Sequence, residues 1–93
     1  MKKYKIRNQI YNNARDLNVK IEPSNKKNKK IDVLRKDKKI SIGDIRYNDF
    51  YSYKEKNVKK SKIKQEAFNK RHDCKNKKPG TAGYYSCKLL WGL

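Results

Sequence analysis

The residues best suited to chemistry in this chain are one histidine and two cysteines, and they lie close together. His72, Cys74 and Cys87 are the only members of their residue types in the 93 residues. An imidazole and two thiolates are zinc ligands, but structural zinc sites take about four ligands and favour paired spacings of Cys and His. The chain has no fourth soft ligand, so we expect no metal here.

The two cysteines leave two further interpretations open. A disulfide between Cys74 and Cys87 would close a loop of about 14 residues and contribute on the order of 3 kcal/mol. A reducing compartment instead favours two thiols, with Cys87 packed as a small apolar residue and Cys74 in a basic loop. An oxidising setting is the one in which we expect the bond.

The histidine is a poor candidate for a catalytic base. General acid-base catalysis needs a partner that orients the imidazole, and an adjacent Asp73 does not provide one. The sequence shows no carboxylate cluster either. We therefore expect a protein that is not an enzyme, with no cofactor and no small-molecule substrate, in which His72 ends a helix.

The basic residues are the stronger functional signal. The chain has 27 Lys and Arg against 9 acids, a formal net charge of +18, and such a balance attracts polyanions. We expect phosphate contacts with nucleic acid, DNA in particular, or contacts with acidic protein surfaces. The alternative is a merely solubilising lysine surface. The expected phosphate-binding residues lie on one loop and one helix: Lys26, Lys27, Lys29, Lys30, Lys59, Lys60, Lys62, Lys64, Lys70 and Arg71.

The aromatic residues allow two interpretations. They can stack on the bases of a single strand, or they can form the core of a domain that has few aliphatic residues. The second is the more common use of such residues. The candidates are Tyr47, Phe50, Tyr51, Tyr53, Tyr84, Tyr85 and Trp91.

These side chains must be positioned by a small fold. Residues 1–16 predict an arm or a short helix, and no apolar run follows the basic start, so we expect neither a secretory signal nor a membrane span. Residues 17–93 are expected to form a single small basic domain. Three alternating apolar pairs predict three short strands: Val19 with Ile21, Ile31 with Val33, and Ile40 with Ile42.

The connections and the second half of the chain complete the prediction. The loops between the strands are short enough for an antiparallel meander. Residues 57–71 predict a basic helix, and residues 81–93 predict an apolar helical segment with Thr81 as its cap. We expect an α+β fold. The predicted apolar stripe of the basic helix consists of Val58, Ile63, Ala67 and Phe68.

The segments described above resemble a family of small uncharacterised basic proteins of large eukaryotic DNA viruses and some phages. In that family the following features succeed one another: a Lys-Pro-Ser start, a strand hairpin, an Ile-Gly-Asp or Phe-Gly-Asp turn with a Tyr-containing loop, a basic Arg-His helix end and a Leu-Trp finish. This chain has Glu22 where the family has the Lys. The matching segments are "VKIEPSNKKNKKIDVL" (19–34), "KKISIGDIRYNDFYSY" (38–53), "KQEAFNKRH" (64–72) and "PGTAGYYSCKLLW" (79–91).

The resemblance implies a viral setting and no established activity. It leads us to expect a virion-associated protein, or one in the host cytoplasm or nucleus, that is not secreted. The alternative function is that of a minor capsid protein that cements coat subunits.

Overall fold

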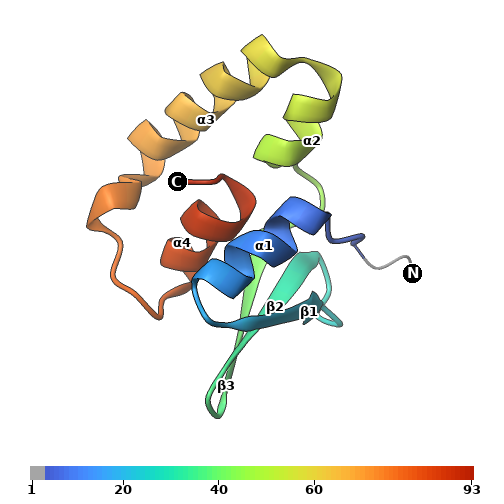
Figure 1. The fold of residues 1–93 in the computed structure, drawn as a ribbon, viewed down its shortest axis with the longest axis vertical. Coiled ribbons are helices and arrows are strands. Elements are labelled where there is room, and N and C mark those ends of the chain that lie inside the picture. Colours follow the sequence, from blue (N-terminus) through green and yellow to red (C-terminus); the bar gives the residue numbers. More distant parts are fainter. Residues whose placement is uncertain (1–3) are drawn as a thin grey trace. The chain divides into compact units, whose positions relative to one another are not determined.

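The computed structural model describes residues 4–93, and these fall into two compact units. The first unit extends to Tyr47 and the second comprises Asn48–Leu93. Figure 1 labels the elements of each unit, which are described separately below. Together they contain a three-stranded antiparallel sheet and four α-helices, so the predicted α+β class is confirmed.

The first unit begins with helix α1 (Asn8–Asp16). Ile10 and Ala14 are buried on this helix, and Ile6 is buried just before it. Their spacing of four residues places all three on one side of the chain, as expected of a short amphipathic helix. Residues 8–16 of the segment predicted to be an arm or a short helix are therefore helical, and residues 1–3 lie outside the described residues.

The sheet of the first unit has the predicted meander topology. Strands β1 (Lys20–Pro23), β2 (Lys29–Arg35) and β3 (Lys38–Asp44) lie in the order β1-β2-β3, and both neighbouring pairs are antiparallel. Only Lys36 and Asp37 separate the paired residues at the β2–β3 turn, where Lys36 has a positive φ of 53°.

The register of the strands follows from their apolar residues. Ile31 pairs with Ile42, and Val33 pairs with Ile40 in the neighbouring strand. Side chains alternate between the two faces of a strand, so these four residues share one face. Ile31, Val33 and Ile42 are buried, which explains why the alternating pattern in the sequence located the strands correctly.

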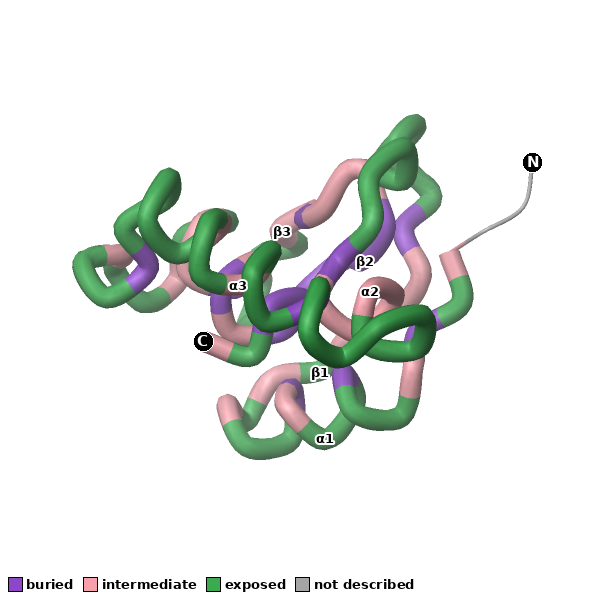
Figure 2. The backbone as a smooth tube through the Cα atoms, turned by 90° about the horizontal axis from the view of Figure 1, so that it is seen from above, coloured by how far each residue is buried: buried purple, intermediate pink, exposed green. Residues whose placement is uncertain are grey.

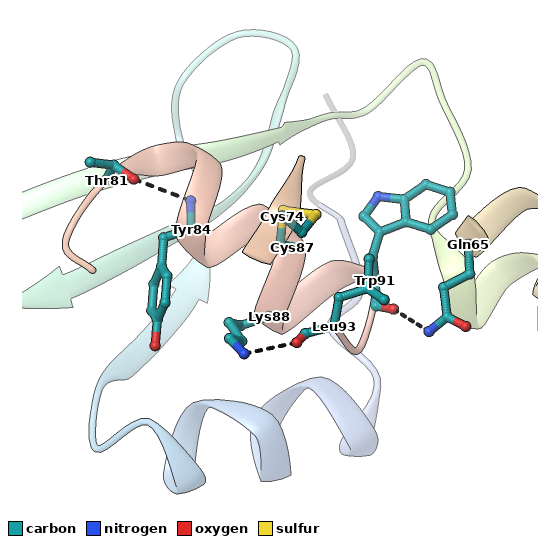
Figure 3. Close-up of a disulfide and its surroundings, with 8 residues drawn as sticks. All are labelled: Gln65, Cys74, Thr81, Tyr84, Cys87, Lys88, Trp91 and Leu93. Carbon is teal, nitrogen blue, oxygen red and sulfur yellow. Dashed lines mark hydrogen bonds between the residues drawn. A yellow bond between two sulfur atoms is a disulfide. The ribbon is translucent and has the colours of Figure 1, made fainter. Parts of the chain in front are cut away.

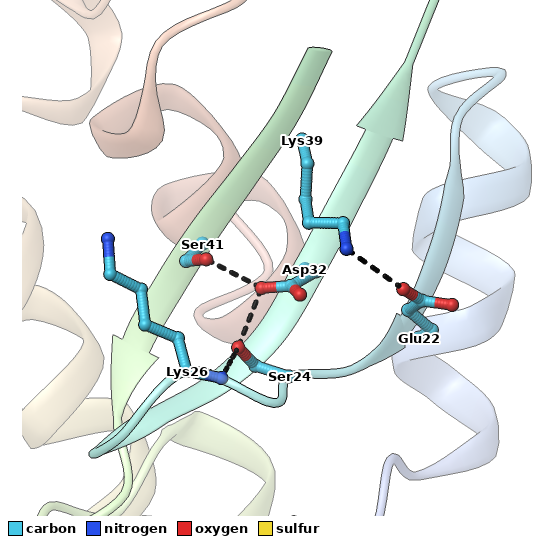
Figure 4. Close-up of polar contacts among 6 residues, drawn as sticks. All are labelled: Glu22, Ser24, Lys26, Asp32, Lys39 and Ser41. Carbon is cyan, nitrogen blue, oxygen red and sulfur yellow. Dashed lines mark hydrogen bonds and ion pairs between the residues drawn. The ribbon is translucent and has the colours of Figure 1, made fainter. Parts of the chain in front are cut away.

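A buried carboxylate occupies the opposite face of the sheet. Asp32 is 2% exposed, and its Oδ1 accepts hydrogen bonds from the hydroxyl groups of Ser24, at 2.7 Å, and Ser41, at 2.6 Å (Figure 4). Burial raises the pKa of Asp32, but these hydrogen bonds and the charges of Lys39 and Lys26 outweigh that effect and leave the pKa below its ordinary value. The network ties β2 to β3 and to the loop that follows β1.

The second unit begins with two consecutive helices, α2 (Phe50–Lys56) and α3 (Val58–His72). Each starts at a side chain that accepts a backbone hydrogen bond: Asp49 from Ser52 N–H at 2.9 Å, and Asn57 from Lys60 N–H at 3.1 Å. Such caps satisfy N–H groups that have no partner within the helix. Helix α3 has nearly the predicted bounds, whereas α2 was not predicted.

The buried side of α3 differs from the prediction. Ser61 is completely buried and Gln65 and Phe68 are half-buried, whereas Val58 and Ile63 are 53% and 66% exposed. The predicted inward stripe is therefore wrong except for Phe68. A polar Ser61 can lie inside because its hydroxyl donates to the carbonyl oxygen of Val58 at 2.6 Å.

The chain ends in a short helical segment, as predicted. After the 3₁₀ turn η1 (Cys74–Asn76), helix α4 (Ala82–Tyr85) continues directly into a π-helical turn, η2 (Ser86–Leu90). The hydroxyl of Thr81 accepts a hydrogen bond from Tyr84 N–H at 3.2 Å, which confirms the predicted cap.

Aromatic rings connect this segment to α2 and α3. The rings of Trp91 and Phe68 are stacked, with centroids 4.4 Å apart and an angle of 12° between the planes. The ring centroids of Tyr53 and Trp91 are 6.3 Å apart, and those of His72 and Phe68 are 4.2 Å apart. The four rings therefore form a continuous column. Gln65 Nε2 donates to the Trp91 carbonyl at 2.7 Å (Figure 3). The column packs beside a core that also contains Leu89 and Leu90, both almost fully buried.

Candidate nucleic-acid interface

Helix α3 presents its basic side chains to solvent. Among its residues only Ser61 is buried and only Gln65 and Phe68 are half-buried, so most of the helix is exposed in Figure 2. None of its basic residues forms an ion pair with another residue of the described part of the chain. The exposed basic residues are Lys59, Lys60, Lys62, Lys64, Lys70 and Arg71.

The helix carries far more positive than negative charge. Glu66 is the single acid in α3. Lys64 also has its Nζ 5.7 Å from the centroid of the Tyr53 ring, an arrangement in which the stem is packed and the ammonium group stays accessible. The helix therefore carries six exposed cations against one acid.

The predicted basic loop is shorter than expected. Lys26 and Lys27 lie in the turn between β1 and β2 and are exposed, but Lys29 and Lys30 belong to strand β2. Lys30 is only 4% exposed, and its Nζ lies 5.1 Å from the centroid of the Tyr4 ring. Its predicted place on an exposed loop is wrong, because the strand begins earlier than its apolar residues suggest.

Another basic cluster was missed in the sequence. The turn between β2 and β3 carries exposed cationic side chains on both strands, with Asp37 as its acid. The sequence signal for this cluster is the run "RKDKK", which predicts a hairpin connection and also places four cations around one acid. We refer to this cluster as the hairpin tip. Its cations are Arg35, Lys36, Lys38 and Lys39.

The Ile-Gly-Asp segment ends in a well-defined polar contact. Arg46 donates to the two carboxylate oxygens of Asp44 through Nε, at 3.0 Å, and through Nη2, at 2.7 Å. Its backbone N–H donates to the same carboxylate at 2.9 Å. These hydrogen bonds lower the pKa of Asp44 to about 2. Arg46 is thereby already neutralised and is a weak candidate for a phosphate contact.

Most of the aromatic candidates are unavailable for base stacking. Tyr85 and Trp91 are 3% and 8% exposed, and four others are half-buried. Tyr47 is the exception at 68% exposed. The half-buried residues are Phe50, Tyr51, Tyr53 and Tyr84.

The cysteines are joined to each other. The structure contains a Cys74–Cys87 disulfide between η1 and η2, with the Cα atoms 5.8 Å apart (Figure 3). The alternative of two free thiols therefore does not describe this form of the protein. Both residues are buried, Cys74 at 8% and Cys87 at 1% exposure.

His72 lies at the end of α3, as predicted. Its ring packs on Phe68, and partial burial lowers its pKa, with the charges of Arg71 and Lys77 lowering it further. The neighbouring Asp73 accepts a hydrogen bond from Asn76 Nδ2 at 2.7 Å, and no hydrogen bond joins Asp73 to His72 within residues 4–93. Across residues 4–93, no three His, Cys, Asp or Glu side chains are grouped in a way that could hold a metal ion.

The comparisons with known proteins add no relative. No protein-family model, curated protein or solved structure matches this chain. In the part of the chain that the structure describes, no helix has the length and apolar character needed to cross a bilayer. The site must therefore be interpreted from its own geometry.

Proposed function

We propose that this chain is a non-enzymatic nucleic-acid-binding protein that contacts phosphates through α3. The observation that carries the proposal is the outward position of all six basic residues of that helix. A lysine or arginine near a phosphate releases condensed counterions, so such a surface binds polyanions in a salt-dependent way. A viral setting, in a particle or in the host cell, is part of the proposal and is supported by the resemblance alone.

The geometry supports phosphate binding better than a merely solubilising surface. A solubilising surface requires only that charges be scattered. Here six cations share one rigid helix, and its single acid, Glu66, cannot neutralise them. From Lys59 to Arg71 the helix rises about 18 Å, a length over which a DNA duplex carries about ten phosphate charges.

The test is a titration of a fluorescent duplex with the intact protein. About six phosphate contacts should weaken binding roughly 10³-fold between 50 and 200 mM salt. Replacing Lys60 and Lys64 with glutamine should weaken binding at 50 mM salt and reduce the slope of log K against log salt by about 1.8.

A matched control separates α3 from the overall charge. Lys5 and Lys20 are also exposed, but they lie in the first unit outside the proposed surface. The K5Q/K20Q variant removes the same charge and should retain the slope of the wild-type protein. If both double variants lost the same affinity and the same salt slope, binding would depend on net charge alone. Absence of binding at 50 mM salt would overturn the proposal, and retention on acidic coat proteins would then favour the capsid function.

A further inference from the structure

The outer face of α3 has an apolar centre as well as charge. Ile63 is 66% exposed, and Ala67, one turn further, is also exposed. A helix turns about 100° per residue, so these two residues lie almost opposite the buried Ser61 and the half-buried Gln65. Water should surround them in the free protein, where they contribute nothing to the core.

The basic residues flank this apolar centre on both sides. By the same helical geometry, Lys59 and Lys70 lie on one flank, and Lys60, Lys64 and Arg71 lie on the other. Each flank is about 50–60° from the centre line. Lys62 and Glu66 lie further round, beyond the first flank. The outer face is thus an apolar line between two rows of cations.

This pattern matches one form of nucleic acid. The major groove of B-form DNA is about 12 Å wide, which admits an α-helix, and its walls are two rows of phosphates. Its floor exposes the methyl groups of thymine, which accept apolar side chains. We infer that α3 binds in the major groove of duplex DNA, with Ile63 and Ala67 against the base edges and the two basic flanks on opposite phosphate walls. This inference rests on the proposed function.

The other nucleic acids fit less well. The major groove of an A-form RNA duplex is too deep and narrow for side chains to reach the bases. A single strand is usually bound by exposed aromatic rings, whereas Trp91 of this chain is buried and stacked on Phe68. An apolar residue between two lines of cations has no equivalent use on a single phosphate backbone. Duplex DNA is therefore the ligand of choice.

The first test removes the apolar contact from the protein. In the intact chain, Ile63→Ser should weaken binding to a 20-base-pair A·T-rich duplex about three- to tenfold, because the buried apolar area is lost. The salt slope should not change, since no phosphate contact is removed. Val58→Ser is the control, because Val58 is also 53% exposed but lies away from the outer face. It should bind like the wild-type protein, and circular dichroism checks that both variants remain folded.

The second test removes the contact from the DNA. A duplex with deoxyuridine in place of every thymidine lacks the C5 methyl groups. The wild-type protein should bind it about threefold or more weakly than the thymidine duplex, whereas the I63S variant, which keeps only the small Ala67 side chain at the base edges, should discriminate clearly less between the two. A double-mutant cycle of this kind reports the pairwise contact itself.

The outcomes distinguish this inference from the proposed function. Salt-dependent binding with equal affinities for the two duplexes, or with no effect of I63S, would overturn groove binding and leave phosphate binding intact. Tighter binding to single-stranded DNA or duplex RNA would also overturn it. If the wild-type protein bound no nucleic acid at 50 mM salt, the groove-binding inference and the proposed function would both be overturned.

Discussion

The carboxylate of Asp32 shows how a single residue holds the sheet together. It accepts hydrogen bonds from serines on either side, one in the loop after β1 and one in β3. The backbone N–H of Lys26 in turn donates to the Ser24 hydroxyl at 3.0 Å, so the network also shapes the basic loop (Figure 4). The two exposed lysines of that loop thus depend on a buried acid for their position.

The Asp32 network predicts an acid-sensitive first unit. The pKa of Asp32 is lower in the folded protein than its ordinary value of 3.8, so its stabilising effect is complete above that value and disappears as the pH falls through the folded pKa. Asp32→Ala leaves the Ser24 and Ser41 hydroxyls without their acceptor and should cost about 1–3 kcal/mol at pH 7.

Urea unfolding of both proteins between pH 2 and pH 7 checks this prediction. The wild-type protein should lose stability below about pH 4, and the D32A variant should lose less over the same interval. Asp44 also titrates there, with a pKa of about 2, and serves as a common background to both proteins. If the free energy of unfolding fell equally with decreasing pH in both proteins, the assigned role of Asp32 would be contradicted.

At the scale of elements, the disulfide connects the end of α3 to the last turn of the chain. Cys74 and Cys87 are 13 residues apart, and the intervening segment contains Pro79, Gly80 and the whole of α4. The bond therefore limits how far the C-terminal segment can move from α3 in the unfolded chain. Its effect should be confined to the second unit, which contains both cysteines.

Reduction of this bond should lower stability without changing the fold. A closed loop of about 14 residues contributes on the order of 3 kcal/mol in the chain-entropy model. The C74S/C87S variant should have a lower melting temperature than the oxidised protein and should no longer respond to dithiothreitol. Alkylation followed by mass measurement confirms the redox state of each sample. A melting temperature unchanged by reduction would show that the bond does not stabilise the unit.

The elements differ in how far they could be predicted from the sequence. The strands were located because Ile31, Val33 and Ile42 alternate with polar residues and bury one face. The inward side of α3 was not, because the buried Ser61 and the half-buried Gln65 face inward through hydrogen bonds to backbone carbonyls rather than through apolar character. Hydrophobic periodicity carries no information about such contacts.

The functional residues could be predicted from the sequence only to a similar extent. Residues on the outside of α3 were predicted correctly as exposed cations, since a run of lysines is seldom buried. Lys30 was not predicted correctly, because its burial beside Tyr4 depends on a contact between distant parts of the chain. The disulfide was left open, because spacing alone does not report whether two cysteines meet.

At the scale of the whole molecule, the charge is shared by both units. The second unit, Asn48–Leu93, has twelve Lys and Arg against four acids, and the remainder of the chain has fifteen against five. Repulsion within each unit is therefore substantial at low salt. Salt should raise the stability of the protein while weakening its binding to polyanions.

The junction between the units should be the first site of proteolysis. Tyr47 is 68% exposed and lies outside any helix or strand, next to the boundary at Asn48. Exposed irregular backbone is where proteases cut most readily. Brief chymotrypsin treatment should yield fragments 1–47 and 48–93, identified by mass. Tyr47→Ser should slow this cleavage, and a first cut at Tyr11, which is 40% exposed but helical, would contradict the prediction.

The burial of both sulfur atoms has a kinetic consequence. Thiol exchange requires a thiolate to reach the bond, and Cys87 is only 1% exposed. Reduction must therefore wait for local opening of the segment, and at high thiol concentration its rate should stop rising. A chain that was oxidised once would keep its bond long after returning to a reducing solution. The redox state of a purified sample would then reflect earlier oxidising conditions and not only the solution in which it is measured.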